Sequence, residues 1–413
     1  MKKYFKSSFD KRIRVLREWW TRWSSKILGG AVVMMIFIAL VWLGYQFWRF
    51  LLRSPPIWPS SPVGAVDLNL RQNEVQRWFA GLPIYHESKN AVYPPASYVI
   101  LWPFLGWLGF MPTLWLWAIT TFVALYWLIH LILRESGANT PFERLFVTLM
   151  PLSMYATGAT IGNGQLIDHL LPVLIAGILL LQQRQWGWKT DLLNTTLLLG
   201  PLVKPSITIP FFWIILFIPK RLRPALFVSI GYGALTLLSA SFQESGLVSI
   251  LHDWVKQIKA LSIYGGHTNL HSWLSYLGLK EWNLPASAIV LGLLGLWTYR
   301  NRQKELWLLL GVTAIVARLW TYHLWYDDLL MILPMVTLFR IAKRGTLTPT
   351  DRSDVFASIL LFIMILANLA PGGRYLLPPP WKNYYITGQV LVWIVTLTFL
   401  INQTRQEKEI KNG

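Results

Sequence analysis

Long apolar runs alternate with short polar loops along almost the whole chain. A run of about 18–20 apolar residues can cross the hydrocarbon core of a bilayer as one helix. The stretch 192–219 is also apolar, but Lys204–Pro205 interrupts it, so we expect two short helices that meet there. The pattern predicts an all-α polytopic membrane protein of about 12 transmembrane helices. The uninterrupted runs lie at 30–52, 112–134, 143–161, 165–183, 224–242, 284–299, 305–322, 326–342, 355–371 and 386–402.

The loops between these runs differ in charge. Lysine and arginine accumulate in the cytoplasmic loops of membrane proteins, so basic clusters indicate the cytoplasmic side. The segment 1–29 mixes many basic residues with tryptophan, which predicts a cytoplasmic helix at the membrane interface. With both termini in the cytoplasm, the number of crossings must be even. Basic clusters also lie at 134–144, 184–189, 219–223, 300–304, 340–345 and in the tail 403–413.

The stretch 91–110 is apolar but is broken by Pro94, Pro95 and Pro103. Counting it as a crossing would make the total odd, so we expect it to lie on the outer face as a juxtamembrane element. Residues 30–402 then form a single transmembrane domain of the plasma membrane with large outer loops at 53–111 and 241–283, and further juxtamembrane helices are expected in those loops.

Composition narrows the function classes. The 413 residues are 54% hydrophobic and 14% charged, with a net charge of +19. The basic cytoplasmic loops account for that charge, so we expect membrane lipid and no nucleic acid as a partner. The chain contains no cysteine, which excludes disulfides, thiolate catalysis and cysteine-ligated metals.

The first outer loop carries a candidate acid–base residue. Asp67 opens an amphipathic helical pattern that Gly81 ends, and Glu74 shares its face. A helix N-cap is an equally good interpretation of Asp67, since aspartate often occupies that position.

Two corners between apolar runs carry polar side chains. The sequence Gly-Asn-Gly-Gln at 162–165 is either a structural turn or the rim of a cavity, and Asp168, one turn later, favours the cavity. At the second corner, Lys204 either extends its amine to the outer headgroups or contacts a phosphate.

The later outer segments add further candidates. Two histidines, His267 and His271, are four residues apart, but nearby glycines argue against the helix that a zinc pair requires. Arg318 lies inside an apolar run, either in an ion pair with Asp327 or Asp168 or in a site for an anionic headgroup. The polar residues at the outer mouth of this run are Tyr322, His323, Tyr326, Asp327 and Asp328.

Several of these segments occur in an order that resembles glycosyltransferase family 87, within the C superfamily of polyprenyl-phosphate-dependent membrane enzymes. Asp67 resembles the acidic residue early in the first outer loop of that family. The other matching elements are "WFAGLPIY" (78–85), "YPP" (93–95), Gly164–Gln165, Lys204–Pro205, "TNLHSW" (268–273) and "HLWYDD" (323–328). His271 departs from the expected asparagine–serine element, and two residues separate His323 from Tyr326.

The resemblance implies a hexosyl- or pentosyltransferase whose site faces the outside. A polyprenyl-phosphate sugar is the donor, a glycan, lipid or polymer supplies the acceptor hydroxyl, and Asp67 is the general base. Lys204 and Arg318 stabilise the leaving phosphate. We expect no cofactor and no divalent cation, because tandem carboxylates at Asp327–Asp328 point in different directions on a helix. The implied substrate-binding residues are Glu74, Tyr93, Asn163, Gln165, Asp168, Lys204, Asn269, Ser272, Arg318, His323 and Asp327.

Two other function classes stay open at this point. A transporter or lipid flippase is the main alternative, although such proteins often show internal repeats and polar groups near the membrane midplane. Here the polar residues gather at the outer ends of the runs, which favours the transferase. A non-catalytic membrane scaffold is the third class.

Overall fold

The computed structural model describes residues 29–51, 64–88, 90–182, 187–219, 222–261, 268–344 and 353–412. In these ranges all regular elements are helices, and the β-type pairing is an isolated bridge between Met154 and Leu369. The predicted all-α class is therefore confirmed for the described chain. The predicted interfacial helix within 1–29 lies outside the described residues.

Four helices in the described ranges are long and apolar enough to cross a bilayer unaided. They are Gly29–Leu51, α5 (Phe110–Ser136), α11 (Leu222–Ala240) and the first part of α19 (Trp381–Asn412). A fifth span results if α7 (Tyr155–Asn163) and α8 (Ile167–Leu180), bent by 116°, count as one.

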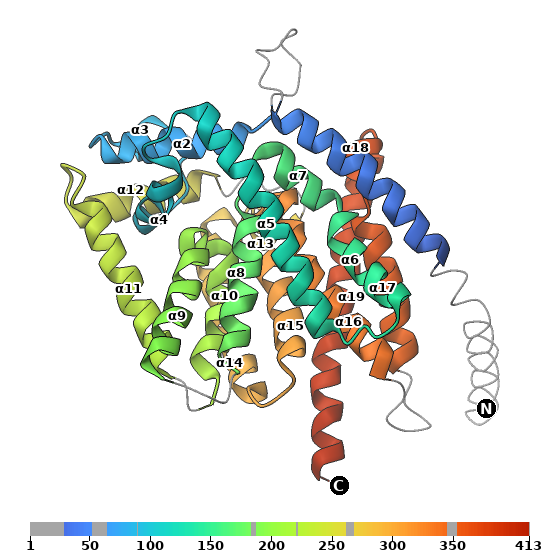
Figure 1. The fold of residues 1–413 in the computed structure, drawn as a ribbon. Helices are drawn as coiled ribbons and strands as arrows, with labels where there is room; N and C mark the ends of the chain where they lie inside the picture. The colour runs from blue at the N-terminus through green and yellow to red at the C-terminus, as the bar shows by residue number, and fades with distance from the viewer. Residues whose placement is uncertain are drawn as a thin grey trace, which may run out of the picture.

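Most of the other predicted runs form helices of 12 to 16 residues packed among these four, whereas α14 (Asn283–Asn301) has 19 residues but is not apolar enough to count as a span (Figure 1). A helix of 13 residues is about 20 Å long, whereas the hydrocarbon core of a bilayer is about 30 Å thick. The number of about 12 full crossings therefore stays a prediction. These helices are α6 (Pro141–Leu152), α9 (Trp188–Leu199), α10 (Pro205–Phe217), α14 (Asn283–Asn301), α15 (Leu306–Leu319), α16 (Ile332–Arg344) and α17 (Ser353–Asn368).

The run at 143–161 is not one helix, so the prediction of a single span there is wrong. It divides between α6 and α7 at Ser153 and Met154. The carbonyl of Ser153 accepts a hydrogen bond from the backbone N–H of Ala370 at 2.8 Å, and Met154 pairs with Leu369. These backbone bonds to a distant segment hold the chain extended where apolar periodicity alone predicts a continuous helix.

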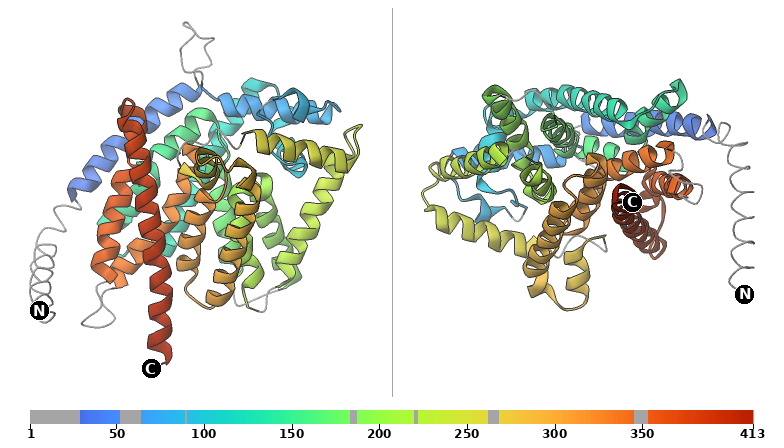
Figure 2. Two further views of the ribbon diagram at one scale, coloured as in Figure 1. Left: turned by 180° about the vertical axis from the view of Figure 1, so that it is seen from behind. Right: turned by 90° about the horizontal axis from the view of Figure 1, so that it is seen from below.

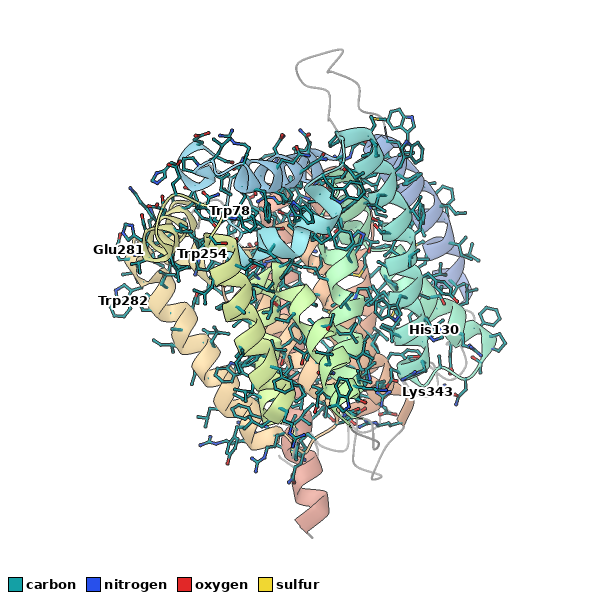
Figure 3. The ribbon with its side chains drawn as sticks, turned by 60° about the vertical axis from the view of Figure 1, so that its left-hand side comes forward. Trp78, His130, Trp254, Glu281, Trp282 and Lys343 are labelled. Atoms are coloured by element: carbon teal, nitrogen blue, oxygen red, sulfur yellow. The ribbon has the colours of Figure 1, made fainter. Side chains whose placement is uncertain are left out.

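A layer of short helices covers one end of the bundle (Figures 1 and 2). Trp78 and Trp254 are labelled at this end in Figure 3. The Trp78 indole N–H donates to the carbonyl of Ser239 at 3.0 Å, and the Trp254 indole donates to that of Val92, also at 3.0 Å. The first bond joins the layer to the bundle at α11, and the second bond joins two segments within the layer. Its members are α2 (Val66–Phe79), α3 (Ile84–Glu87), α4 (Pro95–Leu105), α12 (Leu247–Leu261) and α13 (Leu270–Tyr276).

The segment 91–110 forms α4, which has 11 residues. Its length of about 16 Å is about half of the hydrocarbon thickness, and the position of this segment outside the bilayer stays a prediction. Pro95 occupies the first turn, where proline costs no hydrogen bond. The hydroxyl of Ser97 donates to the carbonyl of Val203 at 2.7 Å, which fixes α4 against the Lys204 corner.

The opposite end of the bundle carries basic helix termini, and Lys343 is labelled there in Figure 3. Lys343 pairs with Glu143 at the start of α6, and Arg340 pairs with Glu305, just before α15, at 2.6 Å. α19 ends beyond the same face (Figure 2). The side of the bundle between the two ends exposes large apolar side chains, such as Ile119 on α5 at 61%, as lipid-facing helices do.

Candidate active site

A cavity of about 240 Å³ lies where the layer of short helices meets the bundle. α2, the segment before α4, the Lys204 corner, α12, α14 and the 3₁₀ helix η4 (Trp325–Met331) all contribute to its wall. Most of its exposed wall is apolar. The predicted site residues that line it are Asp67, Tyr93, Gln165, Lys204 and Asp327.

Asp67 is the second residue of α2, and the residue at the N-cap is Ala65. The N-cap interpretation of Asp67 is therefore wrong. Ala65 has a φ of 53° and donates its backbone N–H to the carbonyl of Gly162 at 2.9 Å, which fixes the start of α2 against the corner at 162–165. Burial raises the pKa of Asp67, while a hydrogen bond from Gln165 and the charges of Arg71 and Lys204 oppose the rise.

The corner at 162–165 is both a turn and part of the cavity. Gly164 ends α7 with a φ of +70°, a conformation that glycine adopts without strain. A Cβ atom there would lie 2.6 Å from the Cβ of Leu68 on α2, so the glycine also permits close approach of the two helices. The Gln165 backbone N–H donates to the carbonyl of Thr160 at 2.9 Å, and the Gln165 side chain reaches Asp67.

Lys204 lies at the predicted break, between the 3₁₀ helix η1 (Gly200–Val203) and α10. Its ammonium donates to Oδ1 of Asp327 at 2.5 Å and lies 4.9 Å from the ring centre of Tyr326. Oδ2 of Asp327 is 2.9 Å from Nδ1 of His323. Because Lys204 is only 9% exposed and paired in the interior, the interpretation that it extends to the headgroups is wrong.

Arg71 is a cavity residue that our sequence reasoning missed. It lies one turn after Asp67, a spacing that places both on one face of α2 and is visible in the sequence. Its guanidinium pairs with Glu74, donates to the carbonyl of Asn90 at 3.1 Å, and lies 4.5 Å from the ring centre of Tyr93. Burial raises the pKa of Glu74 to about 7, although Arg71 opposes the shift.

Several predicted site residues lie outside the cavity wall. His323 is buried behind Asp327, and Glu74 behind Arg71. Asn269 caps α13, where its carboxamide oxygen accepts from the backbone N–H of Ser272 at 3.0 Å and from the Ser272 hydroxyl at 3.1 Å. Asp168 is fully buried in α8.

Asn163 and Arg318 also lie away from the cavity. The Asn163 side-chain oxygen accepts a hydrogen bond from Arg49 at 2.7 Å. Arg318 does form an ion pair, but its partner is Asp328, so the prediction of Asp327 or Asp168 is wrong. The tandem carboxylates do point apart: Asp327 bonds Lys204 and His323, whereas Asp328 bonds Arg318 and the hydroxyl of Tyr155.

One comparison with known proteins gives a match. The model of glycosyltransferase family 87 matches residues 91–341, which is more than half of the chain. The matched range contains Gln165, Lys204 and Asp327 and begins after Asp67. No curated protein and no solved structure matches the chain.

Proposed function

The chain belongs to glycosyltransferase family 87, and from this premise we propose that it transfers a sugar from a polyprenyl-phosphate donor to an acceptor hydroxyl outside the plasma membrane. The observation that carries the proposal is the convergence of Asp67, Gln165, Arg71 and Lys204 on one cavity with a mainly apolar wall. Such a cavity suits a ligand with a charged headgroup and a hydrocarbon tail.

Asp67 is the general base of the proposed reaction. Its carboxylate takes the proton of the acceptor hydroxyl, and the acceptor oxygen forms a bond to the anomeric carbon. The bond from that carbon to the phosphate oxygen breaks, and its electron pair leaves with the polyprenyl phosphate. Gln165 orients the carboxylate by donating a hydrogen bond to it. A single-step inversion needs only this one carboxylate.

Two cations in the cavity wall would stabilise the leaving phosphate. Lys204 offers a point charge, and Arg71 offers a planar fork suited to phosphate oxygens. Asp327 and His323 hold Lys204 in place through the hydrogen bonds described above. We do not assign this role to Arg318, because it lies outside the cavity wall and pairs with Asp328.

The distribution of charge supports an outward-facing cavity. The basic ends of α5, α14 and α16 lie at the end of the bundle opposite α2, with Arg134, Arg300 and Lys343 in their last turns (Figure 1). Basic residues favour the cytoplasmic side, which supports an outside position for the α2 layer and the cavity.

Replacement of the proposed base tests the function directly. Purified protein would be given radiolabelled polyprenyl-phosphate sugars, with envelope membranes as the acceptor, and incorporated label would be counted. Asp67→Asn is expected to lower the rate about 10²–10⁴-fold, the usual contribution of a general base. Glu87→Gln is the matched control, because Glu87 is 46% exposed in the same layer and pairs with Arg77 outside the cavity. Equal incorporation by the wild type and Asp67→Asn would show that Asp67 is not the base.

A further inference from the structure

A second group of cations lies on the other side of η4 from the cavity. Arg318 of α15, Arg374 of α18 (Gly373–Leu376) and Arg49 of the helix Gly29–Leu51 come together around η4 and α7. Figures 1 and 2 show α18 beside the outer end of the helix Gly29–Leu51. We call Arg49, Arg318 and Arg374 the arginine cluster.

Ring contacts and electrostatic interactions connect the three members. The Arg374 guanidinium lies 5.5 Å from the ring centre of Trp325, at the start of η4, and Arg318 bonds Asp328 in the same element. Tyr375 interacts electrostatically with Arg49, Arg374 and Asp328. Gly162 permits the approach of Arg49, since a Cβ atom there would lie 2.3 Å from its Nη2.

The arginine cluster has more positive charge than its described neighbours balance. Asp328 is the carboxylate that pairs with it, Asp67 interacts electrostatically with Arg49, and Asn163 is neutral, so three arginines face two carboxylates. Buried guanidinium nitrogens without a hydrogen-bond partner among the described residues occur in each member: Nε of Arg49, Nη1 and Nη2 of Arg318, and Nε and Nη2 of Arg374. The Arg318 guanidinium lies 5.3 Å from the ring centre of Trp393, but such stacking does not satisfy its N–H groups.

Buried, unpaired guanidinium groups are costly unless an anion completes their hydrogen bonds. Arginine forks match the oxygen geometry of phosphate, and several arginines at one place are typical of phosphate recognition. The cluster lies at the outer end of membrane helices, where lipid phosphates are at high local concentration. We infer that the arginine cluster is a second lipid-phosphate site, separate from the Lys204 cavity.

The phosphate has two possible sources that share this chemistry: the headgroup of an anionic membrane phospholipid, or a polyprenyl phosphate. The inference does not rest on glycosyl transfer, because binding is measured without turnover. A chain that binds lipid phosphate through the arginine cluster but transfers no sugar would contradict only the proposed function, and a chain that transfers sugar while Arg374→Gln leaves binding unchanged would contradict only this inference.

Binding to the purified, delipidated full-length protein in detergent tests the inference. Dioleoylphosphatidylglycerol and farnesyl phosphate would be titrated separately, and the dissociation constant measured by native mass spectrometry. All chains would also carry Lys204→Gln, so that binding in the cavity is weakened. Arg49→Gln and Arg374→Gln are the test variants, and Arg77→Gln is the matched control because Arg77 is a half-exposed arginine of α2 paired with Glu87.

We expect each test variant to weaken binding of at least one probe about tenfold, as loss of a charged hydrogen bond does, and the control to bind like its parent. Weakening for phosphatidylglycerol alone identifies a phospholipid headgroup, and weakening for farnesyl phosphate alone identifies the prenyl phosphate. If binding of both probes is weakened, the site accepts the phosphate of either kind of lipid. Arg374 lies on a four-residue surface helix, so its variant is informative even where Arg49→Gln fails to fold. Unchanged affinity for both probes in a folded Arg374→Gln chain overturns the inference.

Discussion

Two consecutive carboxylates in η4 belong to two different polar regions. Asp327 faces the cavity, where it holds Lys204 and His323, and Asp328 faces the arginine cluster, where it holds Arg318 and Tyr155. Both are almost completely buried, at 1% and 0% exposure. Successive residues of a 3₁₀ helix are about 120° apart, which allows one short element to serve both sides.

The two ion pairs differ in whether their cations line a cavity. Lys204 lines a cavity, so a ligand or water can replace its carboxylate partner. Arg318 has no exposed side-chain surface, so loss of Asp328 leaves its charge in the interior. Equal burial of two carboxylates therefore does not imply equal roles: Asp327 holds a lysine that lines the cavity, and Asp328 neutralises an arginine that lies wholly in the interior.

The largest expected effect is a difference in the free energy of unfolding between two variants that each remove one of these carboxylates. Asp328→Asn should lower the free energy of unfolding by about 3–5 kcal/mol, the cost of breaking a buried ion pair. Asp327→Asn should cost only about 1–2 kcal/mol, because the cavity lets water solvate Lys204. Thermal melting in detergent measures both. Equal losses of Tm in the two variants would contradict the comparison.

The next effect concerns turnover. Lys204→Met should lower kcat about 10²–10³-fold, as removal of one charge-stabilising donor at a transition state does. Initial rates at saturating donor give kcat. Lys256→Met is the matched control, since Lys256 is a lysine of α12 outside the cavity wall. If both variants turn over like the wild type, Lys204 does not stabilise the leaving phosphate.

The cavity side also depends on its glycine corner. Gly164→Ala should cost about 1–3 kcal/mol, from strain at positive φ and from contact with Leu68. Gly137→Ala is a close control, because Gly137 has a φ of +76° but nothing within 4 Å of the added Cβ atom. Melting temperatures of the two variants separate backbone strain from the clash. A larger loss in Gly137→Ala would contradict the packing argument.

Local signals in the sequence predicted much of what positions the site. Gly81 follows α2 with a φ of +78°, the helical run is interrupted at Lys204–Pro205, and α4 begins at Pro95 and has 11 residues. Each feature follows from glycine or proline chemistry within a few residues. We predicted that Asp67, Gln165, Lys204 and His323 border one cavity. The first three line it, whereas His323 lies behind Asp327, a placement that needed the three-dimensional arrangement.

The failed predictions involve partners that are distant in sequence or adjacent carboxylates. Nothing local distinguishes Asp327 from Asp328 as the partner of Arg318, because the choice depends on how η4 is rotated. Arg49 is 114 residues from Asn163, and the segment that interrupts the run at 143–161 comes from around Ala370. Such contacts depend on helix packing, which hydrophobic periodicity does not specify.

The smallest expected effect is a shift in pH dependence on the cavity side. A general base works only when deprotonated, so kcat/KM should fall as the pH falls through the pKa of Asp67, which burial raises above its usual value. Gln165 opposes that rise. Gln165→Leu should therefore raise the pKa of Asp67 further. The acidic limb of the pH–rate profile should move to higher pH by about one unit, which corresponds to the free energy of one hydrogen bond. Gln76→Leu, on the same helix as Asp67 but hydrogen-bonded to the carbonyl of Leu108, should leave the limb unmoved.

Because changes near Asp328 leave Gln165 and Asp67 in place, Asp328→Asn should alter Tm without moving this limb. A limb that moves with Asp328→Asn and not with Gln165→Leu would mean that the two sides of η4 are not separate.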